Sequence, residues 1–167
     1  LMLQVGAHVG GWPVATGGSR TIPDALADII TTHGGSIETG ERVTSMSQLP
    51  NAAAVLFDLT PSALVGIDGL DLGWRHRRAY RSFRHGAAAF KVDYELSGPM
   101  PWADPEVANA GTVHVVGSFD ELVMAEAQVG AGDLPERPFV LVVQACVADP
   151  SRAPSGHHTL WTYAHVP

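Results

Sequence analysis

Histidine is the side-chain type here that most suggests a metal site, because the chain has eight histidines. Imidazole nitrogens bind zinc, and the candidate ligands are His114, His157, His158 and His165. Adjacent histidines on a strand point to opposite faces, and the sequence contains neither HExxH nor a paired CxxC. We therefore expect no metal site and interpret these histidines as surface or hydrogen-bonded groups.

Nucleophilic catalysis and phosphate binding have equally little support. The single cysteine, Cys146, lies in the apolar run from Phe139 to Val147, which predicts an inert buried thiol, and no GxSxG occurs. Several glycines gather near the start of the sequence, but neither GxGxxG after a strand nor GxxxxGK[ST] is present. No catalytic residue is assigned.

The charge balance argues against a nucleic-acid partner. Ten Lys and Arg face seventeen acidic residues, which gives a formal net charge of −7, and phosphate binding needs a cationic surface. The segment from Trp74 to His85 holds five arginines and could form a basic strip. The alternative, which we prefer, is a solvated helix face with two aromatic anchors turned inward.

The sequence indicates a soluble, globular protein of the cytoplasm. No apolar stretch approaches the roughly 18 residues that a transmembrane helix requires, and no secretory signal pattern is recognised. One cysteine cannot form an internal disulfide. The glycine-rich start and the aromatic strand pattern at the end resemble internal sequence, so we expect the chain to be a piece of a longer protein.

The first sixty residues predict a helix followed by two strands. Thr21 with Asp24 resembles a capping box, and Gly34-Gly35 gives a left-handed stop, so the helix should span about 22–33. Short alternating stretches around Val43 and the apolar run 52–59 are of strand length. The helix carries one apolar stripe, formed by Ile22, Ala25, Leu26, Ile29 and Ile30.

The remaining residues predict an antiparallel sheet with covering helices. The segment 87–96 alternates strictly between apolar and polar residues, and further strands are expected at 112–116, 139–147 and 159–165. Ser118 with Glu121 forms a second capping box, which should open a helix ending near Val129. The fold class is therefore α+β.

Five short strings in a fixed order carry a resemblance to a known family. They are GWPVATGGS, ALADIITTHGGSIETGERVTSM, VLFDLTP, FKVDYELSGPMPW and DPSRAPSGHHTLWTYAHVP. In this order they resemble the phytoene-dehydrogenase-like flavoproteins, relatives of the carotenoid desaturases within the flavin amine oxidase superfamily. The resemblance covers nearly the whole chain. It implies a partial Rossmann-like FAD-binding segment at 1–60 and a substrate-binding α+β domain at 61–167.

The same resemblance assigns candidate site residues. It implies that the backbone of Val43 lies against the adenine of FAD and that Gly17 and Gly18 lie near the flavin and substrate. The later strings resemble the substrate-covering domain, and within them we take Trp102, Trp161 and Tyr163 as candidate substrate-cavity residues, with core or domain-interface aromatics as the alternative. The family's GxGxxG and its carboxy-terminal glycine-rich segment are absent from this sequence. We therefore expect this chain alone to retain no FAD and to be inactive.

The expected function is the substrate side of a flavin-dependent oxidoreductase. In the intact protein, hydride would pass from a bulky, apolar small-molecule substrate to FAD. The alternative is a stand-alone, non-enzymatic α+β module that binds a hydrophobic ligand or a protein partner. If the strands expected within 36–60 lack sheet partners, the isolated chain should self-associate through that region.

Overall fold

The computed structural model describes residues 2–11 and 13–167 of the chain. It divides into two compact units, one formed by Leu1–Gly35 with Gly86–Pro167 and the other by Ser36–His85. The boundaries between these units lie at residues 35/36 and 85/86, whereas one boundary at residue 60 was expected from the sequence. Among the described residues, no helix combines the length and the apolar character that crossing a membrane requires.

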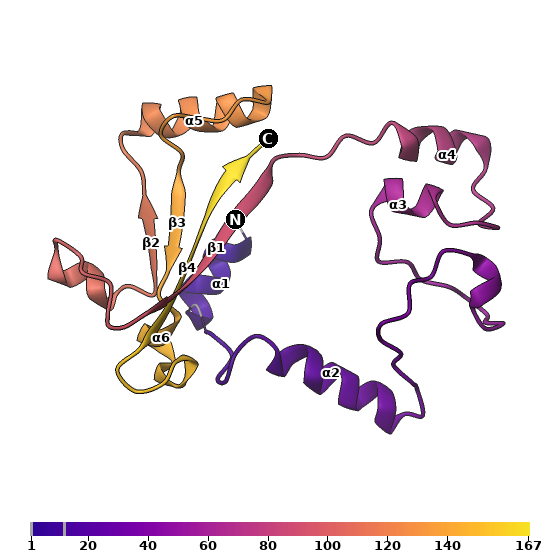
Figure 1. Ribbon diagram of the computed structural model, residues 1–167, viewed down its shortest axis with the longest axis horizontal. Coiled ribbons are helices and arrows are strands. Elements are labelled where there is room, and N and C mark those ends of the chain that lie inside the picture. The colour runs from indigo at the N-terminus through magenta and orange to yellow at the C-terminus, as the bar shows by residue number, and fades with distance from the viewer. Residues whose placement is uncertain (1, 12) are drawn as a thin grey trace. The chain divides into compact units, whose positions relative to one another are not determined.

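A four-stranded antiparallel sheet organises the first unit (Figure 1). Its strands are β1 (Ala88–Leu96), β2 (Thr112–Val115), β3 (Val140–Val143) and β4 (His158–Val166), in the order β1-β4-β3-β2. The sheet and its helices confirm the α+β class. Because all pairings are antiparallel, the described strands form no parallel sheet of the Rossmann type, and that part of the expectation stays a prediction.

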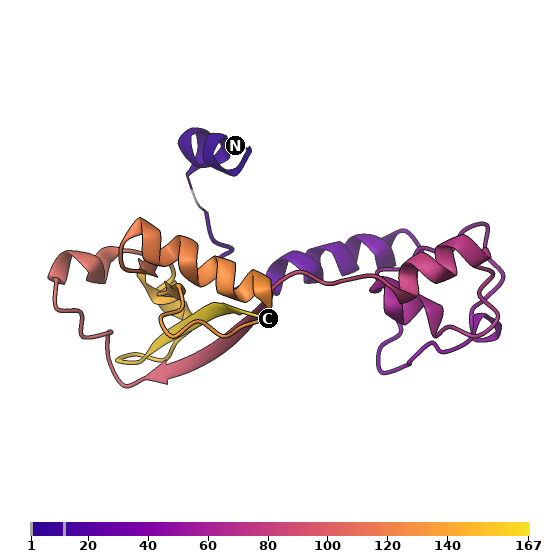
Figure 2. The ribbon, with the colours of Figure 1, turned by 90° about the horizontal axis from the view of Figure 1, so that it is seen from above.

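The helix α5 (Phe119–Ala131) lies along one side of this sheet (Figure 2). The Ser118 hydroxyl accepts the Glu121 amide, while the Glu121 carboxylate accepts the Ser118 amide, so the predicted capping box is confirmed. The hydrogen bond from the Ser118 amide, and next the one from the Arg137 guanidinium, hold the pKa of the Glu121 carboxyl below its usual range. Gly132 ends the helix in the left-handed conformation, as glycine at this position commonly does.

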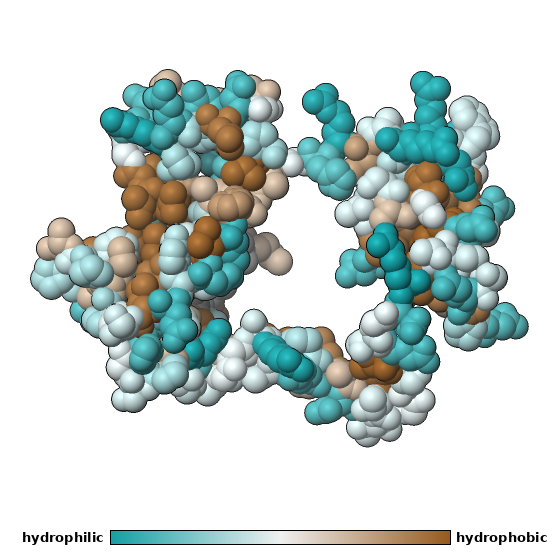
Figure 3. Space-filling model, viewed as in Figure 1, coloured by the Kyte–Doolittle hydropathy of each residue, from teal (hydrophilic) through white to brown (hydrophobic). Residues whose placement is uncertain are grey.

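The core of the first unit is small. Ala125 and Val129 of α5, Val142 of β3 and Leu160 of β4 are buried, and apolar residues gather over β2 and β3 in Figure 3. The third strand is shorter than predicted, because the chain leaves the sheet at Gln144 and forms α6 (Ala145–Ala148). Two 3₁₀ turns, Pro105–Asn109 and Pro150–Arg152, complete the connections.

Two helices of the first unit precede the sheet in the sequence. The first, α1 (Met2–Gly10), was not predicted, and the second, α2 (Thr21–Thr32), confirms the predicted helix and its Gly34-Gly35 stop. Thr21 does not cap α2, because it is already helical and its hydroxyl donates to the carbonyl of Gly18. The apolar stripe is also not buried: Ile29 is 56% exposed, and α2 contains no buried residue.

The second unit consists of short helices and irregular backbone. It contains a 3₁₀ turn at Met46–Gln48, α3 (Pro61–Val65) and α4 (Trp74–Arg81), held in part by a parallel bridge between Ser45 and Asp68.

The strands expected around Val43 and at 52–59 are wrong: the first segment makes only the single bridge of Ser45 with Asp68, and the second has no pairing partner among the described residues. An isolated strand leaves its backbone hydrogen bonds unmade, so apolar character alone does not form one. Self-association through 36–60 was expected to use an unpaired strand edge. This segment contains no strand and therefore offers no such edge.

Candidate functional site

The strand β4 carries three ring side chains on one face. Trp161, Tyr163 and His165 alternate along the strand, so their side chains share a face of the sheet. The rings of Trp161 and Tyr163 are stacked, with centroids 6.1 Å apart and planes 15° apart, and the rings of Tyr163 and His165 are 5.7 Å apart. All three are half-buried. We call these three residues the aromatic row.

A cation closes one end of the aromatic row. Lys91 of β1 stands opposite Tyr163 in the strand pairing, and its ammonium nitrogen lies 5.1 Å from the ring centroid of Trp161. Lys91 also forms an ion pair with Asp93, two residues along the same strand and therefore on the same face. A cation at this distance interacts favourably with the electron-rich ring face.

An acid and further rings lie at the other end. His165 Nδ1 lies 2.9 Å from the carboxylate oxygens of Glu126, which α5 carries toward the sheet. The ring of Phe139 lies 6.3 Å from that of His165 and 5.3 Å from that of His114. The row is thus an apolar surface with a charged group at each end, which suits binding of a ligand.

The structure does not bring Trp102 into this stack. Its indole Nε1–H donates to Gln144 Oε1 at 2.9 Å, and the Gln144 amide nitrogen donates to the carbonyls of Val107 and Ala110 at 3.2 and 2.8 Å. Gln144 is only 8% exposed, so its side chain is a buried link between the loop before β2 and the end of β3. Trp102 thus ties this loop to the sheet through Gln144, and its assignment to a substrate cavity stays a prediction.

The glycine pair near the start of the chain is fastened to a different loop. The Gly17 amide donates to Asp149 Oδ2 at 2.9 Å. Gly18 is buried, and a Cβ atom built there would lie 3.5 Å from the guanidinium carbon of Arg152. Both glycines have positive φ, at 79° and 108°, which explains why this turn uses glycine.

These residues do not fit a flavin site by themselves. The Gly17 amide is already bonded to a carboxylate, whose charge would repel a pyrophosphate. Val43 lies on irregular backbone in the second unit and is 37% exposed. A dinucleotide is ordinarily held by a glycine-rich turn between a strand and a helix, and the described residues provide none.

Asp149 should make the Gly17 turn sensitive to acid. Hydrogen bonds from Ser151 and then from the Gly17 amide lower the pKa of Asp149. A lowered pKa in the folded state means that the contribution to stability is present above the ordinary aspartate range, and it is lost as the pH falls through the lowered value. The amide chemical shift of Gly17, followed by NMR, should therefore titrate below the ordinary pKa of aspartate.

The matched variant is Asp149→Asn, which has no carboxylate to titrate. It should abolish the pH dependence of the Gly17 amide shift in the acidic range. A shift that titrates at the ordinary aspartate value, or that survives in the variant, contradicts this account of the turn.

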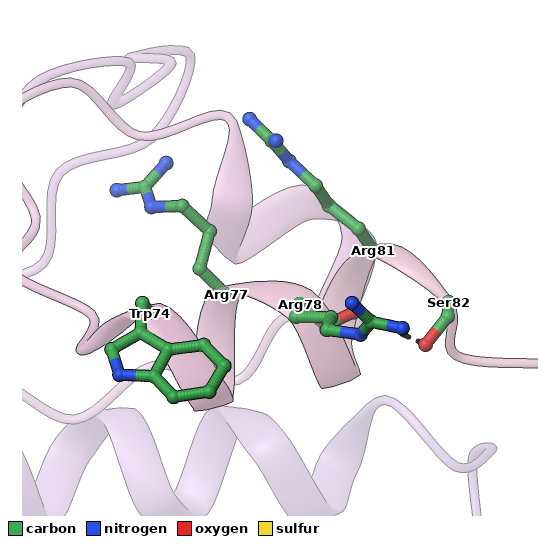
Figure 4. A pocket seen from close by; sticks show the side chains of 5 residues that line it. All are labelled: Trp74, Arg77, Arg78, Arg81 and Ser82. Atoms are coloured by element: carbon green, nitrogen blue, oxygen red, sulfur yellow. Dashed lines mark hydrogen bonds between the residues drawn. The ribbon is translucent and has the colours of Figure 1, made fainter.

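The basic segment differs in detail from the expected helix face. In α4, Arg77 turns inward and donates to the carbonyls of Val65 and Leu70 at 3.4 and 3.2 Å, whereas Trp74 is 72% exposed. Phe83 is also exposed, at 51%, and Tyr80 is half-buried, so the expectation of two aromatic anchors turned inward is wrong. A shallow pocket of about 520 Å³ runs along this helix (Figure 4), lined by Trp74, Arg77, Arg78, Arg81 and Ser82.

The candidate metal ligands are dispersed. His114 and His165 approach Phe139, and His157 lies 3.5 Å from the carboxylate of Glu95. The part of the chain that the structure describes contains no group of three His, Cys, Asp or Glu side chains able to hold a metal ion. Cys146 is buried, and its sulfur lies 3.3 Å from the backbone nitrogen of Thr159, whose amide donates to it.

Comparisons with protein-family models, with curated proteins and with solved structures find no match for this chain. The family resemblance therefore stays a prediction from the residues that carry it. The geometry of the aromatic row is independent of that resemblance, because it follows from the register of β1 and β4.

Proposed function

We propose that this chain supplies the substrate-binding side of a flavin-dependent oxidoreductase that acts on a bulky apolar small molecule. The observation that carries the proposal is the stacked, half-buried pair Trp161 and Tyr163 on one face of the sheet. Both residues belong to the string that resembles the substrate-covering domain of the flavoprotein family. Sequence resemblance and geometry thus point to the same two side chains.

Binding at the row would be driven by burial of apolar surface. Each aromatic side chain offers a large, rigid face, and covering apolar surface contributes about 25 cal/mol per Å² before the entropic costs of association. The charged groups at the ends, Lys91 and Glu126, would orient a ligand that carries a polar end. The row therefore favours an extended apolar molecule over a compact polar one.

The proposal also concerns the cofactor, the partners and the cellular compartment. FAD would be bound in the intact protein, where the glycine-rich turn that holds its pyrophosphate would come from parts other than the described residues. The net charge of −7 disfavours nucleic acid as a partner, and a chain with one cysteine is suited to the cytoplasm. The second candidate is a non-enzymatic module that binds an apolar ligand, which the same row would support without any cofactor.

A titration with retinol, a polyene alcohol, tests ligand binding at the row. Retinol fluorescence should rise on binding, and Trp161→Leu should weaken the affinity about tenfold, which corresponds to roughly 1.4 kcal/mol. Trp74→Leu is the matched control, because it removes an exposed tryptophan from α4, and it should leave the affinity unchanged. Failure of the native chain to bind, or equal affinity in the two variants, would contradict the proposal.

A further inference from the structure

The strand β1 leaves one side of the sheet open. Among the described strands it pairs only with β4, and its pairing is continuous over nine residues. Natural proteins protect such edges with charged side chains, prolines, bulges or very short strands, and of these devices β1 has only its charges. The other edge strand, β2, has only four residues, whereas β1 (AAFKVDYEL) contains no proline and no glycine. An accessible hydrogen-bonding edge therefore runs the length of β1.

The side chains of β1 are largely exposed on both faces. Phe90 and Tyr94, on one face, are 64% and 46% exposed. On the other face, the side chains of Lys91 and Asp93 are 47% and 69% exposed. A strand laid against this edge would therefore meet aromatic rings on one face and a pair of opposite charges on the other.

The order of these residues is self-complementary about Val92. If two copies of β1 paired antiparallel with Val92 opposite Val92, each Lys91 would stand opposite Asp93 of the other copy. Each Phe90 would stand opposite Tyr94. Opposite charges and aromatic pairs directly across a strand pair each stabilise the pairing. The twofold axis makes every such pair occur twice.

The neighbouring registers are unfavourable. Centring the pair on Lys91 or on Asp93 places two like charges directly opposite each other. Centring it on Tyr94 places Asp93 opposite Glu95 twice. Like charges directly opposite destabilise a strand pair. Centring on Asp93 would also place Lys91 opposite Glu95 twice, but only the register at Val92 opposes both opposite charges and aromatic rings without opposing any like charges.

We propose that β1 is a homodimerisation edge, which pairs antiparallel with β1 of a second copy about a twofold axis at Val92. The partner is a second copy because the charge pattern of the strand complements itself. The sheet then continues across the axis from one copy to the other. This inference is independent of the proposed catalytic or ligand-binding role.

Charge variants test the pairing. By sedimentation velocity over a concentration series, the native chain should show a concentration-dependent dimer. Lys91→Asp and Asp93→Lys should each be monomeric, because each places like charges opposite one another in a homodimer. Mixing the two variants in equal amounts should restore a dimer, because all the opposed charges then attract.

The mixing experiment separates loss of pairing from loss of folding, because misfolded variants would not regain a dimer on mixing. Far-UV circular dichroism of each variant supplies an independent check of the fold. A native chain that is monomeric at every concentration would overturn the proposal. Single variants that dimerise as strongly as the native chain would also overturn the proposal.

Disulfide trapping tests the register. Opposite residues of an antiparallel pair have Cα atoms about 4.5–5.5 Å apart, within the range that a disulfide bridges. Val92→Cys should therefore give a covalent dimer under mild oxidation. Glu95→Cys is the control, because two copies of residue 95 would lie roughly 20 Å apart at about 3.4 Å per residue. Equal trapping of both variants, or trapping of Glu95→Cys alone, would overturn the register.

Discussion

Replacing Gln144 by leucine is expected to lower the free energy of unfolding by about 3 kcal/mol, because several polar partners lose their hydrogen bonds together. The Gln144 side chain accepts from the Trp102 indole and donates to the carbonyls of Val107 and Ala110. Leucine has a similar size but no polar atom. Each partly buried group left unpaired costs roughly 1–3 kcal/mol, and solvent can satisfy some of them.

Urea unfolding followed by circular dichroism measures this loss. Gln128→Leu is the matched control, because Gln128 is exposed on α5 and the chemical change is the same. A surface substitution of this kind should change stability by no more than about 0.5 kcal/mol. If the two leucine variants unfold at the same urea concentration, the buried link around Gln144 is wrong.

Leu160→Ala should be similarly damaging, and Ile29→Ala should be nearly neutral. Leu160 is 6% exposed in the middle of β4, and truncating a buried leucine typically costs about 2–5 kcal/mol. Ile29 is 56% exposed on α2, so its loss should cost less than about 1 kcal/mol, partly offset by the higher helix propensity of alanine. Both variants remove branched aliphatic side chains of equal size.

The difference between the two losses in unfolding free energy is the informative quantity. Denaturant titration of both variants under the same conditions measures it. The apolar stripe on α2 made Ile29 look like a core residue in the sequence. A loss at Ile29 equal to that at Leu160 would show that the stripe is packed after all.

Local signals explain what the sequence predicted well. The capping box at Ser118 and the left-handed Gly132 both act within one helix turn, so α5 can be read from the residues alone. The alternation along β1 likewise follows from the two-residue period of a strand. These features need no knowledge of distant partners.

Long-range pairing explains what the sequence missed. The run 52–59 has the length and apolar character of a strand, but a strand forms only where a partner satisfies its backbone. β3 also ends earlier than predicted, at Val143, and the chain then forms α6, while the Gln144 side chain binds the loop at Val107 and Ala110. Thr21 failed as a cap for a local reason, since α2 begins one residue earlier than a cap at Thr21 requires.

The candidate site was predictable only in part. Trp161 and Tyr163 could be named from the sequence, because they alternate in a segment of strand character. Their neighbours could not, because the contact of Lys91 with Trp161 depends on the register of β1 and β4, and that of Glu126 with His165 depends on how α5 meets the sheet. The sequence also did not show that the Trp102 indole hydrogen-bonds to Gln144 and lies outside the stack of Trp161 and Tyr163.

Photolabelling with an aliphatic diazirine probe tests the central claim most directly, because it reports where an apolar ligand sits. After irradiation and proteolysis, mass spectrometry should find the label on the β4 peptide that contains Trp161 and Tyr163, and Trp161→Leu should reduce it. The exposed stripe of α2 around Ile29 is the competing apolar surface. Labelling concentrated on α2, with β4 unlabelled, would contradict the assignment of the aromatic row as the ligand site.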